Sequence, residues 1–158
     1  TTFLVQLLPA WSGHLGKRLV KSPKIYLNDT GLATAILGQG DEAALRDSHL
    51  LGPLLENFAV VELSKQITWS KTEPGLFHFR TLAGQEVDMV LESPSGELVG
   101  IEVKAAATVH AEDFRWLRLL AEETGKRFRC GVVLYQGRET VPFGKNLHAL
   151  PIEALWQA

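Results

Sequence analysis

The chain has 158 residues, 46% of them hydrophobic and 22% charged, which is enough for one complete core and typical of a globular domain. A formal net charge of −2 argues against a protein whose whole surface grips nucleic acid. Its apolar runs fall short of the roughly 18 to 20 residues that a membrane-spanning helix needs. The single cysteine, Cys130, excludes an internal disulfide and a multi-cysteine metal site.

The start of the chain, Thr-Thr-Phe-Leu-Val, has no initiator methionine, basic n-region or cleavage site. We therefore expect an internal start, in a piece of a longer protein. With no membrane segment and no need for an oxidising compartment, we expect a cytoplasmic location.

The first third of the chain predicts two strands and two short helices. Residues 2–9 and 24–28 have the character of strands, and Asp29 and Asp41 can cap helices over 32–37 and 42–47. The loop between the strands is basic and could contact phosphate, although such a run is more often a solvated surface. Its cations are Lys17, Arg18, Lys21 and Lys24.

A longer helix is predicted over 54–67, because Pro53 suits a first helical turn and the following residues have a helical pattern. The helix is apolar on more than one side, so we expect it to be buried. Glu56 and Glu62 project into these apolar stripes, where an unpaired carboxylate is costly. Each therefore needs a cation or a hydrogen-bonding partner.

Three strands with short turns follow, over 76–82, 86–92 and 98–105, and should form an antiparallel meander. A helix over 112–123, a strand over 129–135 and a short edge strand over 146–150 complete the pattern. This order predicts an α/β (α+β) fold with one mixed sheet. We place a boundary at residue 50, which separates a segment of residues 1–50 from a domain of residues 51–158.

The third strand of the meander carries two charged residues in an otherwise apolar run. Because side chains alternate along a strand, Glu102 and Lys104 share a face, roughly 7 Å apart. On the preceding strand the same alternation groups Asp88 with Val90 and places Val87 on the opposite face with Met89 and Leu91. If the hairpin brings Asp88 beside the pair, two carboxylates and an ammonium converge. A Glu–Lys pair is commonly a surface ion pair, but its place within an apolar strand favours a site.

Two carboxylates with a nearby carbonyl suit a hard divalent cation such as Mg²⁺ or Mn²⁺. Asp88 and Glu102 would hold the ion, and the backbone carbonyl of Val103 could complete the set. Lys104 would orient the attacking water or offset negative charge in a phosphoryl transition state. A carboxylate from the long helix, Glu56 or Glu62, could add a ligand.

The segments Gln85-Glu-Val-Asp88 and Ile101-Glu-Val-Lys104 resemble motifs II and III of the PD-(D/E)XK nucleases. The element order matches their restriction-endonuclease-like core, and Glu56 stands where that fold has its first-helix glutamate. The resemblance extends to 24–32, 52–58 and Phe79-Arg80, which look like a prokaryotic domain of unknown function that usually follows a winged helix at the C-terminus of AAA-type ATPases. It implies that residues 2–28 close such a winged helix and that residues 17–24 form its wing.

The resemblance implies a metal-dependent phosphodiesterase acting on DNA, with Asp88, Glu102, Lys104 and Glu56 at its centre and an ATPase domain in the parent protein. A second hypothesis is a non-catalytic module that keeps the nuclease fold and binds a protein or DNA. The chain has no phosphate loop, since Thr124-Gly125-Lys126 lacks the preceding glycine and strand, so no ATP site is expected in it. The pattern does not indicate an oligomeric state.

Overall fold

The computed structural model describes residues 3–13, 19–46 and 48–157. The N-terminal part forms an antiparallel pair, β1 (Val5–Leu8) with β2 (Lys24–Leu27), followed by α1 (Thr30–Ile36) and α2 (Glu42–Arg46). Asp29 caps α1 as predicted, with its carboxylate accepting a hydrogen bond from the Leu32 amide at 2.9 Å. The first strand runs over Val5–Leu8, which is shorter than the predicted range of residues 2–9.

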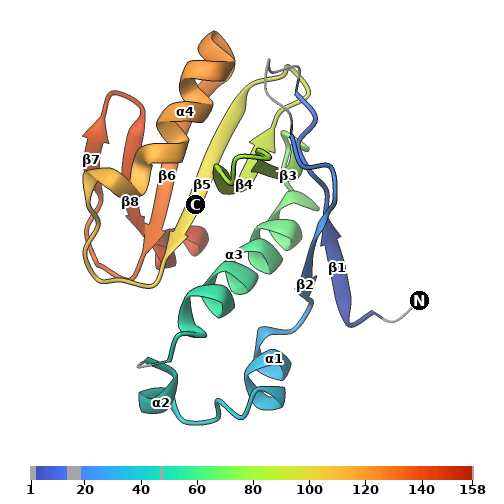
Figure 1. Ribbon diagram of the computed structural model, residues 1–158, viewed down its shortest axis with the longest axis vertical. Helices are drawn as coiled ribbons and strands as arrows, with labels where there is room; N and C mark the ends of the chain where they lie inside the picture. The colour runs from blue at the N-terminus through green and yellow to red at the C-terminus, as the bar shows by residue number, and fades with distance from the viewer. Residues whose placement is uncertain (1–2, 14–18, 47, 158) are drawn as a thin grey trace.

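Helix α3 (Leu51–Ile67) is buried along much of its length, as predicted. Pro53 lies in its first turn, where a missing amide hydrogen is tolerated. Ala59, Val60 and Leu63 pack against the sheet, and Figure 1 shows the helix beside the β1–β2 pair.

The central sheet has the strand order β3-β4-β5-β6-β8-β7. The predicted meander is confirmed by antiparallel pairing of β3 (Gly75–Arg80) with β4 (Glu86–Glu92) and of β4 with β5 (Leu98–Lys104). Strand β6 (Phe128–Tyr135) then pairs parallel to β5, which makes the sheet mixed. A parallel partner requires a crossover, and α4 (Arg115–Thr124) supplies it, preceded by a 3-10 turn over Ala111–Phe114.

Two hydrophobic clusters cover the opposite faces of this sheet. Leu117 and Leu120 of α4 belong to the cluster on one face, while Val60 and Leu63 of α3 belong to the cluster on the other. Figure 1 shows α4 lying over β5 and β6. The arrangement is therefore a three-layer α/β sandwich whose middle layer is the mixed sheet.

One strand was missed and another was misplaced in the sheet. We expected residues 146–150 to form an edge strand, but β8 (Leu147–Pro151) lies between β6 and the unpredicted β7 (Val141–Gly144). Strand β7 is the edge, and its Pro142 is a residue that edge strands tolerate. A 3-10 turn over Ile152–Trp156 follows β8.

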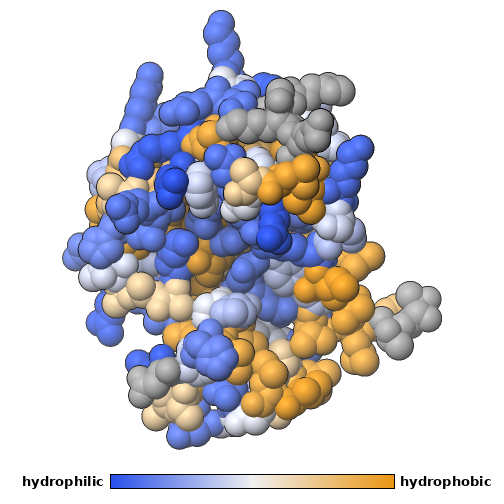
Figure 2. All heavy atoms as spheres, in the orientation of Figure 1, coloured by the Kyte–Doolittle hydropathy of each residue, from blue (hydrophilic) through white to orange (hydrophobic). Residues whose placement is uncertain are grey.

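Exposed apolar side chains gather on the N-terminal part of the molecule (Figure 2). Leu7 is 60% exposed on β1, Ile25 is 68% exposed on β2, and Ile36 is 70% exposed on α1. The opposite side of the hairpin is buried, since Leu8 and Tyr26 join the cluster that contains α3. None of the helices within the described ranges has the length and apolar character of a bilayer-spanning segment.

Candidate active site

A register shift between β3 and β4 decides where Asp88 points. Over the shift β3 advances two residues while β4 advances three, so β4 carries one extra residue. Val87 and Val90 consequently both pack on the α4 side, whereas Met89 packs on the α3 side. The predicted alternation, which grouped Val87 with Met89, is wrong here because it assumed an unbroken period of two.

The carboxylate of Asp88 lies where the β4–β5 pairing stops. The last paired residues are Met89 and Ile101, and beyond them the Val103 amide donates to Asp88 Oδ2 at 2.9 Å. A side-chain oxygen thus replaces the backbone carbonyl that a longer strand would have supplied. The structure in this way brings Asp88 next to the strand that carries Glu102 and Lys104.

Glu102 and Lys104 share one face of β5, as the alternation predicted. Lys104 Nζ lies 3.6 Å from Glu102 Oε2, with the lysine side chain 37% exposed and the glutamate side chain 6% exposed. The other oxygen, Glu102 Oε1, is buried without a hydrogen-bond partner among the described residues. An unpartnered buried acceptor costs about 1 to 3 kcal/mol, and a bound cation at this atom would offset that cost.

Burial and neighbouring negative charges raise the pKa of both carboxyl groups. Burial, with the nearby Asp88 charge, raises the pKa of Glu102 to about 9. Burial, with the charge of Glu56, raises the pKa of Asp88 to about 6, against the opposing hydrogen bond from the Val103 amide. A bound cation would lower the pKa of both groups, because a positive charge favours the ionised form of each.

Glu56, not Glu62, is the helix carboxylate at this site. Glu56 Oε1 accepts hydrogen bonds from Tyr26 Oη at 2.5 Å and from Lys24 Nζ at 2.9 Å. Glu62 lies further along α3 and pairs with Lys65 instead, at 2.6 Å. Both glutamates therefore have the partners that their apolar surroundings require.

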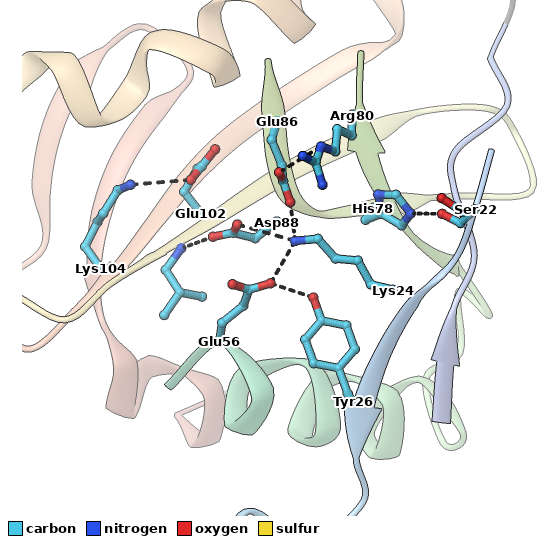
Figure 3. A network of polar contacts seen from close by, with 11 residues as sticks. Ser22, Lys24, Tyr26, Glu56, His78, Arg80, Glu86, Asp88, Glu102 and Lys104 are labelled. Carbon is cyan, nitrogen blue, oxygen red and sulfur yellow. Dashed lines mark hydrogen bonds and ion pairs between the residues drawn. The ribbon is translucent and has the colours of Figure 1, made fainter. Parts of the chain in front are cut away.

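Lys24 from β2 completes the cluster. Its Nζ forms ion pairs with Glu56 and Glu86 and lies 4.0 Å from Asp88 Oδ1. Figure 3 shows Asp88 between two groups of side chains, with Glu102 and Lys104 to one side and Lys24, Tyr26 and Glu56 to the other. The pattern reasoning missed the contacts of Lys24, Tyr26 and Glu86, and the only signal for them was that Glu56 needed a partner.

The predicted nucleic-acid-binding loop is described only in part. Lys17 and Arg18 lie outside the described residues. Lys21 is exposed, whereas Lys24 is turned onto the carboxylates, with its side chain 22% exposed. Among the described residues, a phosphate contact by this loop is thus a prediction that rests on Lys21.

Asp88 and Glu102 could hold a divalent cation, but the described residues do not form a metal centre with three side-chain ligands. Within the described ranges, no three carboxylate, imidazole or thiol side chains are grouped closely enough to hold a metal ion. Two observations still suit a cation, namely the unpartnered Oε1 of Glu102 and the raised pKa of both carboxyl groups. Val103, whose carbonyl was the third predicted ligand, contacts Asp88 through its backbone amide.

A hollow of about 820 Å³ opens beside the cluster, lined by Lys104 and by residues of the α4 region that include Arg115, Trp116 and Arg118. Lys104 thus joins the buried carboxylates to an open surface.

Two family models and two curated proteins match the chain. Residues 1–43 match one of these families, described as a domain of unknown function (DUF8612). An uncharacterized protein of Mycobacterium tuberculosis, Rv2008c, and one of Mycobacterium bovis, Mb2031c, are each 28% identical over 152 residues. The matches cover 96% of this chain but 32% of each relative, so the chain spans about a third of their length.

No solved structure matches the chain. Residues 51–155, from the start of α3 into the 3-10 turn after β8, match the family described as a domain of unknown function (DUF4143). Since that match covers more than half of the sequence, the chain belongs to the DUF4143 family.

Proposed function

We propose that this domain is a divalent-cation-dependent phosphodiester hydrolase of the PD-(D/E)XK type, acting on DNA. The observation that carries the proposal is the buried oxygen Glu102 Oε1, which lacks a partner among the described residues and lies on the same strand face as Lys104. Asp88 supplies the second carboxylate from the neighbouring strand. Buried carboxylates with raised pKa beside an ammonium are more common at functional sites than on structural surfaces.

Asp88, Glu102 and the Val103 carbonyl would hold Mg²⁺ or Mn²⁺, which when bound supplies charge neutralisation and a more acidic water molecule. The side chains of the domain would do the rest. Lys104, partly exposed at the hollow, would place its positive charge against a non-bridging phosphate oxygen. In the overall reaction water adds to phosphorus, the bond to the leaving sugar oxygen breaks, and that oxygen takes up a proton.

The order of the helices and strands supports this proposal. A helix, a three-strand meander, a crossover helix and a parallel strand occur in the order of a restriction-endonuclease-like core. Because the relatives are about three times as long as this chain, they have room for further domains, and we propose an AAA-type ATPase domain preceding this segment in the parent protein. Residues 1–50 would then include the end of a winged helix.

A cleavage assay tests the proposal. Labelled double-stranded and single-stranded DNA, with RNA in parallel, would be incubated with the chain and millimolar Mn²⁺ or Mg²⁺. We expect cleavage of DNA that chelation abolishes and that Glu102→Gln and Asp88→Asn each reduce at least about 100-fold. Lys71→Met, which changes an exposed lysine outside the site, should cleave like the unmodified chain. Equal cleavage by all four proteins would overturn the assignment of the site.

A specific observation also favours a second function, a non-catalytic module that binds a protein or DNA for its parent ATPase. Lys24 Nζ already neutralises part of the carboxylate cluster through Glu56 and Glu86. A folded chain that binds DNA or a protein partner but neither binds Mn²⁺ nor cleaves any of the substrates would support this alternative.

A further inference from the structure

The ammonium of Lys24 lies on the opposite side of Asp88 from Lys104 and is enclosed by acidic groups (Figure 3). It pairs with Glu86, is 2.9 Å from Glu56 Oε1 and lies 4.0 Å from Asp88 Oδ1. A lysine ammonium surrounded by carboxylate oxygens makes the charge contacts that a bound metal cation would make. It differs in carrying one charge instead of two.

The strand that carries Lys24 is held in place by contacts to α3. The side-chain amide of Asn57 donates to the Leu27 carbonyl at 2.9 Å and accepts from the Leu27 amide at 2.8 Å. Tyr26, two residues after Lys24, donates to Glu56. The backbone of β2 is therefore fixed, and the position of the ammonium follows from the register of this strand.

Lys24 stays charged in these surroundings. Its ammonium forms ion pairs with Glu56 and Glu86, and both carboxylates favour the charged form. A permanent positive charge so close to Asp88 repels a second cation at the same carboxylate. A divalent ion bound by Asp88 therefore favours displacement of the ammonium.

The structure offers space for that displacement. A hollow of about 440 Å³ between β2, α1 and α3 is lined by Lys24 and Glu56 together with apolar residues such as Leu37 and Leu54. A lysine side chain has a long flexible stem, so its head can leave the carboxylates while β2 stays paired.

We propose that Lys24 is an internal competitor for the metal site, an autoinhibitory contact that a divalent cation must displace from Asp88. This rests on the proposed metal site and adds its regulation. The competitor belongs to the segment that matches one family, residues 1–43, whereas the carboxylates belong to the segment that matches the other, residues 51–155.

Mn²⁺ titration calorimetry on matched variants tests the competition. Lys24→Met removes the charge, and we expect it to bind Mn²⁺ at least about tenfold more tightly than the unmodified chain, because a like charge near the ion is gone. Lys24→Arg keeps the charge and Lys71→Met changes a lysine outside the site, so both should bind like the unmodified chain. Equal or weaker binding by Lys24→Met would overturn the competition.

A second measurement uses the unmodified chain, in case Lys24→Met does not fold. An amine-reactive label followed by peptide mass spectrometry reports how accessible Lys24 is relative to Lys71. We expect Lys24 labelling to rise several-fold when Mn²⁺ is added, with Lys71 unchanged. Saturating Mn²⁺ that leaves Lys24 protected would overturn the displacement.

The two proposals fail in different ways. If the unmodified chain binds Mn²⁺ and Asp88→Asn does not, the metal site stands, and the Lys24 results decide the competition alone. If neither the unmodified chain nor Lys24→Met binds Mn²⁺, the metal site fails and the competition is refuted with it.

Discussion

Replacing Glu102 by glutamine should make the metal-free protein more stable at alkaline pH. Glutamine keeps the shape of the side chain and removes the ionisable group, which is 5% exposed in the folded chain. The folded chain holds the Glu102 proton up to a pKa of about 9, while the ordinary pKa is 4.5. Between these values the folded state binds more protons than the unfolded state, so the free energy of unfolding falls as pH rises.

The size of this effect is bounded by the shift and by the surroundings. Each unit of pKa change is worth about 1.4 kcal/mol, which makes several kcal/mol the upper limit at pH 8. Lys104 lies 3.6 Å away and offsets part of the penalty. We therefore expect Glu102→Gln to raise the free energy of unfolding by about 1 to 3 kcal/mol at pH 8, because glutamine takes up no proton on folding. At pH 5 the gain should be close to zero.

Urea unfolding followed by tryptophan fluorescence, at pH 5 and pH 8 with a chelator present, measures this difference. The matched control is Glu92→Gln, because Glu92 accepts hydrogen bonds from Trp11 at 3.0 Å and from Arg127. That variant should lose stability at both pH values. If Glu102→Gln also destabilises the protein at pH 8, the carboxylate is well satisfied and the reasoning is refuted.

Three further substitutions test separate parts of the structure. Lys104→Met should slow DNA cleavage about 100-fold without weakening Mn²⁺ binding, since its charge acts on the phosphate; a loss of Mn²⁺ binding in calorimetry would contradict this role. Asn57→Ala should lower the free energy of unfolding by about 2 kcal/mol, because it orphans the Leu27 amide and carbonyl, and an unchanged urea midpoint would count against that clamp. Gly100→Ala places a Cβ 2.6 Å from Leu117 Cδ2, so it should cost about 1 to 3 kcal/mol and lower the melting temperature; an unchanged melting temperature would show that α4 yields freely.

Hydrophobic periodicity was sufficient to predict the elements that form the frame of the site. The apolar pattern after Pro53 predicted α3, and the turn residues between three short apolar runs predicted the meander. The regular alternation on β5 placed Glu102 and Lys104 on one face. These features depend on local sequence, which is why a single sequence was enough to predict them.

The features that were missed depend on contacts between distant residues. The extra residue in β4 is visible only in its pairing with β3, so the alternation on β4 could not be predicted from β4 itself. Strand β7 contains Pro142 and Gly144, which are poor strand signals, and it forms by pairing with β8. Lys24 reaches Glu56 across 32 positions in the sequence, and its basic neighbours suggested a solvated loop.

Binding of Mn²⁺ to the unmodified chain and to Asp88→Asn, measured by calorimetry at pH 7.5, tests the central claim most directly. The account predicts binding by the unmodified chain, release of a proton from Glu102, whose pKa is raised to about 9, and no binding by Asp88→Asn at the same metal concentrations. Millimolar Mn²⁺ that produces no binding heat with the unmodified chain, or equal binding by both proteins, would contradict a metal site at Asp88 and Glu102.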